Sequence, residues 1–369
     1  MIRLLREISK QLELEEDGQT LAKIGLLLAT ARLVMLQVVF TDLIIGLIFV
    51  CSSISLAAGG EPTGFSVGIS GNGVTIFSLW MAQAGGFYKK EGLNVEVIDM
   101  EGSTRGIQVL LSGKIHVMHA GLGPVLQANR QGADLRIVAA TSNSIPFTFF
   151  ASPDVKTATD LKGGIVAIGT FGSEGDIAVT LALKQLGLSR RDVIIVQVGE
   201  FSKRFTALVS GQVKATPLVE PASTIARDRG LNPLVDLAAA KIPWVFTGVT
   251  VNRSSLKNYR DLLARFIRAE IEGAYFALAN PTRSKEVIAL KFKTNDPKAI
   301  EATYNDFKRI TQLDFEPSQA GAENVVRQLE AIGINVGSKN MEDHIDNSII
   351  QTLKKEGFFT SMKQRYNVQ

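Results

Sequence analysis

The chain has 369 residues, of which 46% are hydrophobic and 21% charged, and its formal net charge is +4. This length suits two domains of roughly 100–200 residues each, and the mild basic excess contains no lysine- or arginine-rich stripe of the kind that binds nucleic acid. The one cysteine, Cys51, excludes a disulfide framework within the chain and a metal site built from several cysteines.

The first 58 residues are typical of an export segment. Within them, residues 43–51 resemble the apolar core of a signal peptide, and small residues follow this core. A retained membrane anchor is the alternative, because residues 24–54 exceed the roughly 20 residues that span a bilayer, although Asp42 is costly near the middle of such a span. We expect export and cleavage, with the mature protein in the periplasm or another extracytoplasmic space and anchored only if residues 24–54 are retained.

Beyond the export segment, short apolar runs alternate with helical patterns until about residue 255, and helices then continue to the C-terminus. This alternation predicts an α/β fold with parallel sheets and helices on both faces. The predicted strands are 65–69, 95–98, 115–120, 135–140, 147–151, 165–168, 192–197 and 214–219. The predicted helices of the C-terminal region are 259–280, 283–291, 297–313, 320–332 and 341–356.

The turn at residues 102–105 (GSTR) is the first candidate for a ligand contact. It follows a predicted strand and opens a helix for which Ser103 is the predicted N-cap. In open α/β sheets such turns face the crevice where ligands bind, and their free backbone N–H groups suit an anion. Arg105 either contacts the ligand or is a solvated helix side chain. The predicted contacts are Gly102, Ser103, Thr104 and Arg105, together with Gly121 in the turn after the next strand.

Two histidines, His116 and His119, form an HxxH pattern within a predicted strand. Residues three apart on a strand point to opposite faces, so these two side chains cannot hold one metal ion together. His119 lies nearer the carboxyl end of the strand, where it either reaches the crevice or serves as a buried, hydrogen-bonded histidine. We therefore expect no metal site.

Four further residues are weaker candidates for ligand contact. Asn72 and Asn143 follow the first and fourth strands, where polar ligand contacts commonly arise, although their role as turn residues explains them equally well. Trp80 offers a face on which a flat ligand could stack, but its helical spacing is more typical of the core. Glu220 either pairs with a cationic ligand or, as we favour, with Arg227.

Five sequence blocks point to one known family. They are residues 78–96 (SLWMAQAGGFYKKEGLNVE), 160–163 (DLKG), 187–188 (GL), 207–213 (ALVSGQV) and 220–221 (EP). In order and spacing they resemble the nitrate/sulfonate/taurine group of periplasmic solute-binding proteins, whose superfamily also contains binders of thiamine-pyrimidine precursors. The resemblance covers about residues 65–276. It departs from the family at His116 and Lys214, where relatives commonly carry aspartate.

The resemblance implies a type II periplasmic-binding-protein fold, in which two lobes close on one solute. Each lobe has a mostly parallel sheet flanked by helices, and a helical C-terminal region packs on the first lobe. The implied bounds are 64–148 and 249–369 for lobe 1 and 153–243 for lobe 2, with hinge strands at 147–152 and 245–251. A small-molecule solute and the membrane subunits of an ABC permease are the implied partners, and the protein is expected to be a monomer without a cofactor.

In this arrangement the turn at residues 169–173 (GTFGS) faces residues 102–105 from the second lobe. Its predicted ligand contacts are Thr170, Phe171 and Ser173, and Ser173 also caps a helix with Asp176 in the capping-box position. Two facing helix N-termini suit a sulfonate, carboxylate, nitrate or phosphate group. Glu174 and Asp176 already satisfy part of the second helix dipole, so the predicted preference for an anion is moderate.

The sequence contains no signature of nucleotide binding or hydrolysis: it has no Walker loop, dinucleotide fingerprint, GxSxG elbow or HExxH motif. The leading hypothesis is an exported receptor for a small anionic or polar solute, rather than an enzyme. An enzyme on the same fold, of the pyrimidine-precursor or menaquinone-pathway type, is the first alternative, but the cysteine-rich motif of the former is absent. A membrane-tethered sensor domain is the second.

Overall fold

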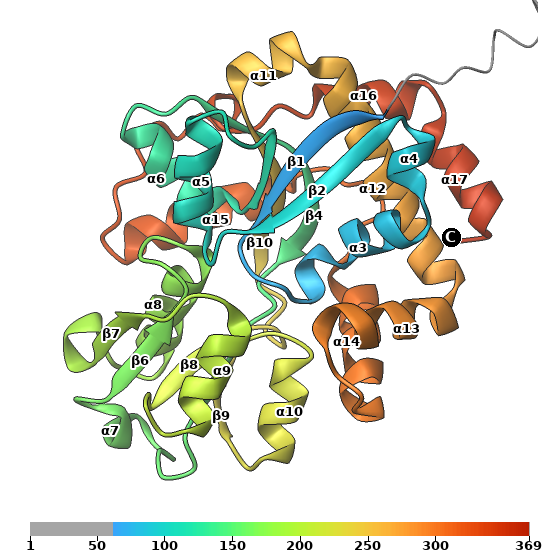
Figure 1. Ribbon diagram of the computed structural model, residues 1–369. Coiled ribbons are helices and arrows are strands. Elements are labelled where there is room, and N and C mark those ends of the chain that lie inside the picture. Colours follow the sequence, from blue (N-terminus) through green and yellow to red (C-terminus); the bar gives the residue numbers. More distant parts are fainter. Residues whose placement is uncertain (1–61, 369) are drawn as a thin grey trace, which may run out of the picture. The chain divides into compact units, whose positions relative to one another are not determined.

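The structure is a computed structural model that describes residues 62–368 (Figure 1). The predicted export segment, Cys51 and the possible anchor at residues 24–54 lie outside the described residues. Within residues 62–368, no helix combines the length and the apolarity needed to cross a bilayer.

The first sheet has five strands in the order β2-β1-β3-β10-β4. Strand β1 (Thr63–Ile69) runs parallel to β2 (Leu93–Asp99) and β3 (Val117–Ala120). Strand β10 (Pro243–Asn252) is antiparallel to both β3 and β4 (Leu135–Ser144). Four of the five strands therefore share one direction, which confirms a mostly parallel sheet.

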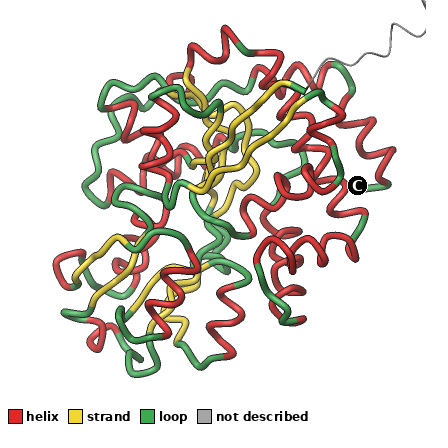
Figure 2. The backbone as a smooth tube through the Cα atoms, in the orientation of Figure 1, coloured by secondary structure: helices red, strands yellow, loops and turns green. Residues whose placement is uncertain are grey.

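The second sheet repeats this design in the order β7-β6-β8-β5-β9. Strand β6 (Ile165–Ile168) runs parallel to β7 (Ile194–Gln197) and β8 (Ala215–Leu218). Strand β5 (Thr148–Ala151) is antiparallel to β8 and to β9 (Asn232–Asp236). The two groups of strands are separated by loops (Figure 2), which confirms the two-lobed α/β fold.

The chain passes between the sheets twice. Residues 145–147 connect β4 to β5, and residues 237–242 connect β9 to β10. The two passages run side by side, because Pro243 pairs with Ser144 and the Ala238 N–H donates to the Phe147 carbonyl at 3.0 Å. The predicted hinge strands 147–152 and 245–251 thus fall largely on β5 and β10, next to these connections.

Helices cover both faces of the first sheet. The part of the chain before β4 supplies η2 (Val74–Ile76), α3 (Phe77–Ala84), α4 (Phe87–Lys90), α5 (Ser103–Leu111) and α6 (Leu122–Arg130). The long α12 (Arg260–Ala279) packs on α3 (Figure 1). This contact needs Gly273, since a Cβ there would lie 2.6 Å from the Ser78 carbonyl oxygen and from the Ala82 nitrogen.

The second sheet carries the shorter helices α7 (Ala158–Leu161), α8 (Glu174–Gln185), η3 (Arg190–Asp192), α9 (Phe201–Val209) and α10 (Ala222–Asp228). The C-terminal region is helical, as predicted. Besides α12, it contains α11 (Arg253–Asn258), α13 (Pro281–Phe292), α14 (Pro297–Ile310), α15 (Gln319–Ala331), η4 (Met341–Asp343), α16 (Ser348–Lys355) and α17 (Phe358–Tyr366).

The prediction of a single helix at 341–356 is wrong. The structure instead has η4, a short extended piece and α16. The extended piece lies beside β4, where the Ile137 N–H donates to the His344 carbonyl at 2.8 Å and Ile345 forms an isolated bridge to Ile137. Pairing with the free edge of β4 competes successfully with helix formation at these residues.

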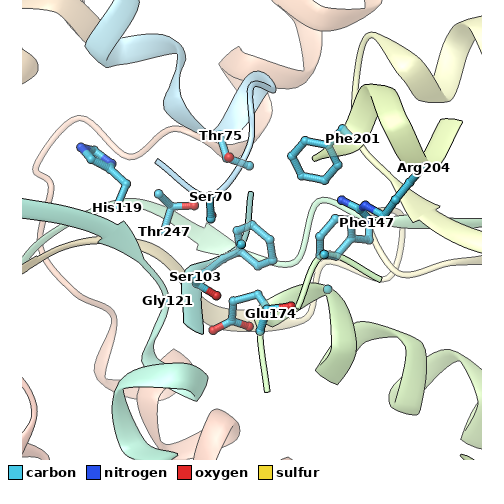
Figure 3. Close-up of a pocket in the computed structure, with 15 residues that line it drawn as sticks. Ser70, Thr75, Ser103, His119, Gly121, Phe147, Glu174, Phe201, Arg204 and Thr247 are labelled. Carbon is cyan, nitrogen blue, oxygen red and sulfur yellow. The ribbon is translucent and has the colours of Figure 1, made fainter. Parts of the chain in front are cut away.

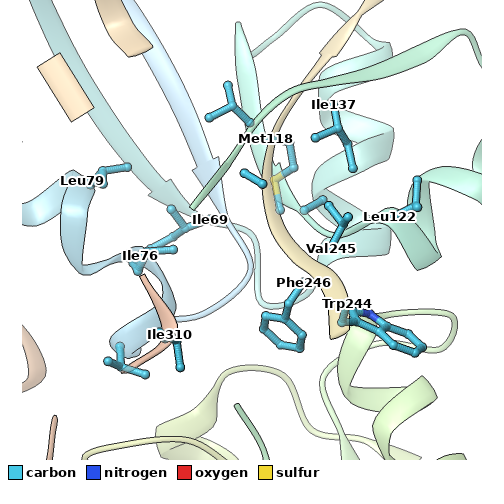
Figure 4. Packing of buried hydrophobic residues seen from close by; sticks show 14 of the residues in the cluster. Ile69, Ile76, Leu79, Met118, Leu122, Ile137, Trp244, Val245, Phe246 and Ile310 are labelled. Carbon is cyan, nitrogen blue, oxygen red and sulfur yellow. The ribbon is translucent and has the colours of Figure 1, made fainter. Parts of the chain in front are cut away.

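The hydrophobic core is continuous around β10, the strand that follows the second passage (Figure 4). Trp244, Val245 and Phe246 are all buried there, together with Met118 and Ile137 from the neighbouring strands. Strand β10 is buried along nearly its whole length because helices cover both faces of the sheet. This packing fixes the strand ends that form the cavity described next.

Candidate functional site

A cavity lies between the two lobes, where the strand ends of both sheets meet (Figure 3). Five of the predicted ligand contacts line it: Gly102, Ser103, His119, Gly121 and Ser173. Its volume is about 30 Å³, which is room for about one water molecule. The lobes are therefore closed upon each other, and a larger solute requires them to separate.

Ser103 differs from its predicted role. Gly102 is the N-cap of α5, and Ser103 is the first helical residue, so its hydroxyl caps nothing. Ser103 is 2% exposed, and within residues 62–368 its Oγ has no hydrogen-bond partner. A buried hydroxyl without a partner is costly, and this one lines the cavity. It is thus available to a ligand.

The turns of the two lobes touch beside the cavity. The Thr104 hydroxyl donates to the Phe171 carbonyl at 2.8 Å, and the Gln127 amide donates to the Gly172 carbonyl at 3.1 Å. A Cβ on Gly102 would lie 2.4 Å from Thr170 Oγ1. Thr104, Thr170 and Phe171 therefore make the contact between the closed lobes and do not line the cavity.

The Gly102→Ala variant is expected to bind its ligand about tenfold more weakly, because the added methyl group meets Thr170 only when the lobes are closed. Removing the whole opposing side chain in the double variant Gly102→Ala/Thr170→Gly is expected to restore most of the affinity, because Thr170 Cβ itself would lie 3.0 Å from the new methyl carbon. Titration calorimetry of both variants checks this. Gly64→Ala is the control, since nothing lies within 4 Å of a Cβ there. An unrescued double variant would contradict the explanation.

Arg105 does not line the cavity. Its Nη1 donates to Glu101 Oε2 at 3.1 Å on the surface. Of the two predictions for Arg105, its position therefore matches the solvated helix side chain. Glu101 also pairs with Lys203 of α9 in the second lobe. The hydrogen bond from Lys203 lowers the pKa of Glu101. This ion pair joins the lobes at the surface, beside the cavity.

Arg204 is the cation of the cavity, and the sequence analysis missed it. The residue is 3% exposed, and its guanidinium lies over the Phe201 ring at 4.5 Å (Figure 3). Its Nε donates to the Gly199 carbonyl at 3.1 Å and its Nη1 to the Pro217 carbonyl at 2.7 Å. Within residues 62–368 no carboxylate forms an ion pair with it. Burial lowers the pKa of Arg204 to about 9, because its charged form is taken out of water.

Glu174 is the other charged residue of the cavity that was not among the predicted contacts. It opens α8 in the second lobe, yet both carboxyl oxygens accept hydrogen bonds from the first lobe. The Gly123 N–H donates to Oε1 at 3.0 Å, and Trp244 Nε1 donates to Oε2 at 2.8 Å. Burial raises the pKa of Glu174 to about 8 despite these bonds. The group is therefore mostly neutral near pH 7.

His119 lies on the wall of the cavity, but its ring is directed away from Ser103 and Glu174 (Figure 3). The ring packs edge-on against Phe266, and Nε2 lies 3.4 Å from Glu270 Oε2 inside the first lobe. Across residues 62–368, no group of three histidine, cysteine, aspartate or glutamate side chains is arranged to hold a metal ion.

The remaining candidates lie outside this cavity. Asn72 accepts from Trp80 Nε1 at 2.9 Å and donates to the Lys291 carbonyl at 2.6 Å, and the Lys291 ammonium covers the Trp80 ring at 4.0 Å. Asn143 donates to the Glu316 carbonyl at 2.9 Å and accepts from the Ser318 N–H at 3.0 Å, where it holds the loop before α15. These contacts give all three side chains structural roles.

Glu220 lines a separate cavity near the passages between the lobes. Its Oε2 accepts from the Thr224 N–H at 3.1 Å, and its Oε1 lies 3.5 Å from Arg227 Nη1. The favoured pairing with Arg227 is thus present. Burial raises the pKa of Glu220 above its usual range.

Most of the cavity wall was not among the predicted contacts. The missed hydroxyl groups belong to Ser70, Thr75 and Thr247, and the missed aromatic rings to Phe201 and Phe246. One signal for Arg204 was available. Phe201, Arg204 and Leu208 recur at helical spacing, which places a charged residue on the buried stripe of α9.

Known proteins resemble this chain at the level of sequence. A family model described as "NMT1/THI5 like" matches residues 75–284. The riboflavin-binding protein RibY of Chloroflexus aurantiacus is 29% identical over 226 residues, which are 58% of this chain and 61% of RibY. The chain thus spans about three fifths of the length of this relative.

Solved structures resemble it at the level of the fold. A protein from Bordetella bronchiseptica superposes with a TM-score of 0.73 at 19% identity, covering 80% of this chain and 98% of its own. The alkanesulfonate-binding protein SsuA of Xanthomonas axonopodis pv. citri, bound to MOPS, superposes with a TM-score of 0.61 at 17% identity, covering 76% of this chain and 96% of its own. The desulfurization enzyme DSZB superposes with a TM-score of 0.56 at 16% identity, covering 79% of this chain and 99% of its own.

Proposed function

The chain belongs to the NMT1/THI5-like family, and on this premise we propose that it is an exported binding protein that encloses one small anionic solute between its lobes and delivers it to an ABC permease. The observation that supports the anion is Arg204, a buried guanidinium that faces the cavity and has no carboxylate partner among the residues that the structure describes. A bound anion supplies the charge that Arg204 lacks.

The other donors of the cavity suit the same ligand group. The Ser103 hydroxyl has no partner, and the N-terminus of α5 has no side-chain cap, so its amides also lack a side-chain acceptor. Together with Arg204 they offer hydrogen bonds from opposite lobes. A sulfonate, carboxylate or nitrate group accepts from both sides at once, which makes lobe closure depend on the ligand.

Solute entry requires movement of the lobes, because the closed cavity admits about one water molecule. We propose that the lobes rotate about residues 145–147 and 237–242. Lobe 1 then ends with β4 and resumes with β10, and lobe 2 runs from β5 to β9. The fold relationship to SsuA agrees with a sulfonate-like ligand. The relationship to RibY favours riboflavin as the alternative.

We propose binding without chemical turnover. An enzyme on this fold is the competing possibility, since DSZB shares the architecture. The cavity wall offers hydroxyl groups, one guanidinium and one mostly neutral carboxyl, and its histidine ring faces Glu270 in the interior of lobe 1. This set binds and orients an anion.

A thermal-shift screen of the protein with methanesulfonate, taurine, nitrate, benzoate, a neutral pyrimidine and riboflavin tests the proposal. At 100 times its Kd, a ligand adds about 2.7 kcal/mol of stability, or about 5 °C in Tm. We expect one or more anions to do so and to be recovered unchanged by mass spectrometry. Stabilisation by riboflavin or the pyrimidine alone would refute the anion, and appearance of a product would refute a pure binding role.

A further inference from the structure

Glu174 bridges the two lobes at the floor of the cavity. It belongs to the first turn of α8 in the second lobe, whereas its hydrogen-bond donors, Gly123 of α6 and Trp244 of β10, belong to the first lobe. Trp244 is 0% exposed. The carboxyl group is therefore inserted into the first lobe and is not merely placed at its surface.

The inserted carboxyl group caps helix α6. The N-cap of α6 is Gly121, which has no side chain to satisfy the first amides of the helix. Glu174 Oε1 accepts from the Gly123 N–H and takes this role from the opposite lobe. The glycine is needed for this, because a Cβ on Gly121 would lie 2.2 Å from Oε1.

The N-terminus of α8 is closed as well. The Ser173 hydroxyl accepts from the Asp176 N–H, and the Asp176 carboxylate accepts from the Gly172 N–H at 2.8 Å and pairs with Arg190. Asp176 thus completes the cap through Gly172 and not through the reciprocal bond to Ser173 that the capping-box position predicts. Two of the helix N-termini at the cavity, those of α6 and α8, already hold carboxyl groups of the protein.

We propose that Glu174 sets the charge of the solute: by occupying the N-terminus of α6 from the opposite lobe, it restricts the closed cavity to ligands with a single negative charge. This inference rests on the proposed function. The groups that remain free are Arg204, with one positive charge, and the α5 turn with Ser103. They balance one negative charge. A second one would be buried beside the Glu174 carboxyl with no cation of its own, which is unfavourable where water is excluded.

Sulfate and methanesulfonate test this directly, because they are similar in size and tetrahedral shape but carry two and one negative charges throughout pH 6–9. By titration calorimetry of the whole protein at pH 7.5, we expect methanesulfonate to bind at least about tenfold more tightly than sulfate. In Glu174→Ala the N-terminus of α6 is free for a second charge, and the preference is expected to shrink by about tenfold. Glu174→Gln keeps the shape, caps α6 and is neutral like the mostly protonated wild-type carboxyl, so it is expected to keep most of the wild-type preference.

Glu101→Gln is the matched control, since it removes one carboxylate that also contacts the opposite lobe but lies at the surface. Its ratio of the two Kd values is expected to equal that of the wild type. The ratio is measured within each variant, so a change in stability does not distort it, and circular dichroism establishes that each variant folds.

Three outcomes would overturn the inference, and they are distinguishable. Equal affinity of the wild type for the two anions, or an unchanged ratio in Glu174→Ala, refutes the role of Glu174 and leaves the binding function intact. If neither anion binds the wild type at 50 mM, this inference fails; the proposed anion-binding function fails as well if nitrate, taurine and benzoate also leave the Tm unchanged.

Discussion

Replacing Arg204 by glutamine is expected to weaken methanesulfonate binding by about 100-fold while leaving the ligand-free protein at least as stable as the wild type. Loss of one partner from a buried, hydrogen-bonded charge pair costs about 2–5 kcal/mol of binding free energy, and tenfold corresponds to about 1.4 kcal/mol. Stability is not expected to fall in proportion. The pKa of Arg204 is lowered to about 9 by burial, so its charge is unfavourable without a ligand.

Opposite effects on binding and on stability separate a ligand contact from a structural arginine. If Arg204 served only to hold the Gly199 and Pro217 carbonyls, its replacement would lower Tm and affinity together. Arg204→Lys, which keeps the charge, is expected to retain part of the affinity. Arg229→Gln is the control, because Arg229 lies over the Phe205 ring in the same lobe but is exposed. Calorimetry and thermal unfolding of the variants give both quantities.

The stability of the wild type is expected to fall, relative to Glu174→Gln, as pH rises from about 4.5 to 8. In this window the folded protein retains a proton on Glu174, whose pKa is raised to about 8 by burial, and the unfolded chain has released it. The slope is at most about 1.4 kcal/mol per pH unit, on the order of 4 kcal/mol in total. Above pH 8 the carboxyl is ionised in both states, and the dependence ends.

Urea unfolding of both proteins from pH 5 to 9 measures this difference, and subtraction cancels the other titrating groups. No charged side chain among the described residues contributes to the raised pKa of Glu174: α6 and β10 face its carboxyl group with the N–H groups of Gly123 and Trp244, and Arg204 lines the same cavity. Glu101→Gln is the control, since the lowered pKa of Glu101 makes its contribution constant in this window. A difference that stays constant from pH 5 to 8 would contradict the burial of Glu174 in solution.

The positions of most strands and helices followed from local pattern. The strand at 65–69, the helix cap at Ser173 and the C-terminal helices each depend on residues within a few positions of one another. Such short-range preferences can be predicted from a single sequence. The helix predicted at 341–356 failed because the free edge of β4, some 200 residues earlier, pairs with Ile345.

The candidate site was less predictable because its chemistry depends on contacts between the lobes. Ser103 was found through its turn, but the expected cap role was wrong, since Gly102 ends the turn one residue earlier and leaves the hydroxyl unpaired. Arg204 and Glu174 are ordinary helix residues by local criteria, one in an amphipathic helix and the other in an acidic first turn. The carboxyl group of Glu174 is buried against the opposite lobe, whereas Arg204 is held over Phe201 by carbonyl groups of its own lobe.

The sequence by itself thus determined the α/β class, the family and the turns from which a ligand is approached, because periodicity and turn chemistry act over short distances. The tertiary structure alone decided which groups in those turns stay free. Closure of the lobes places the Glu174 carboxyl on a helix 51 residues earlier in the chain, and no carboxylate within residues 62–368 pairs with Arg204. Charge balance in a water-excluding cavity is a property of all the groups that meet there, and no single segment contains it.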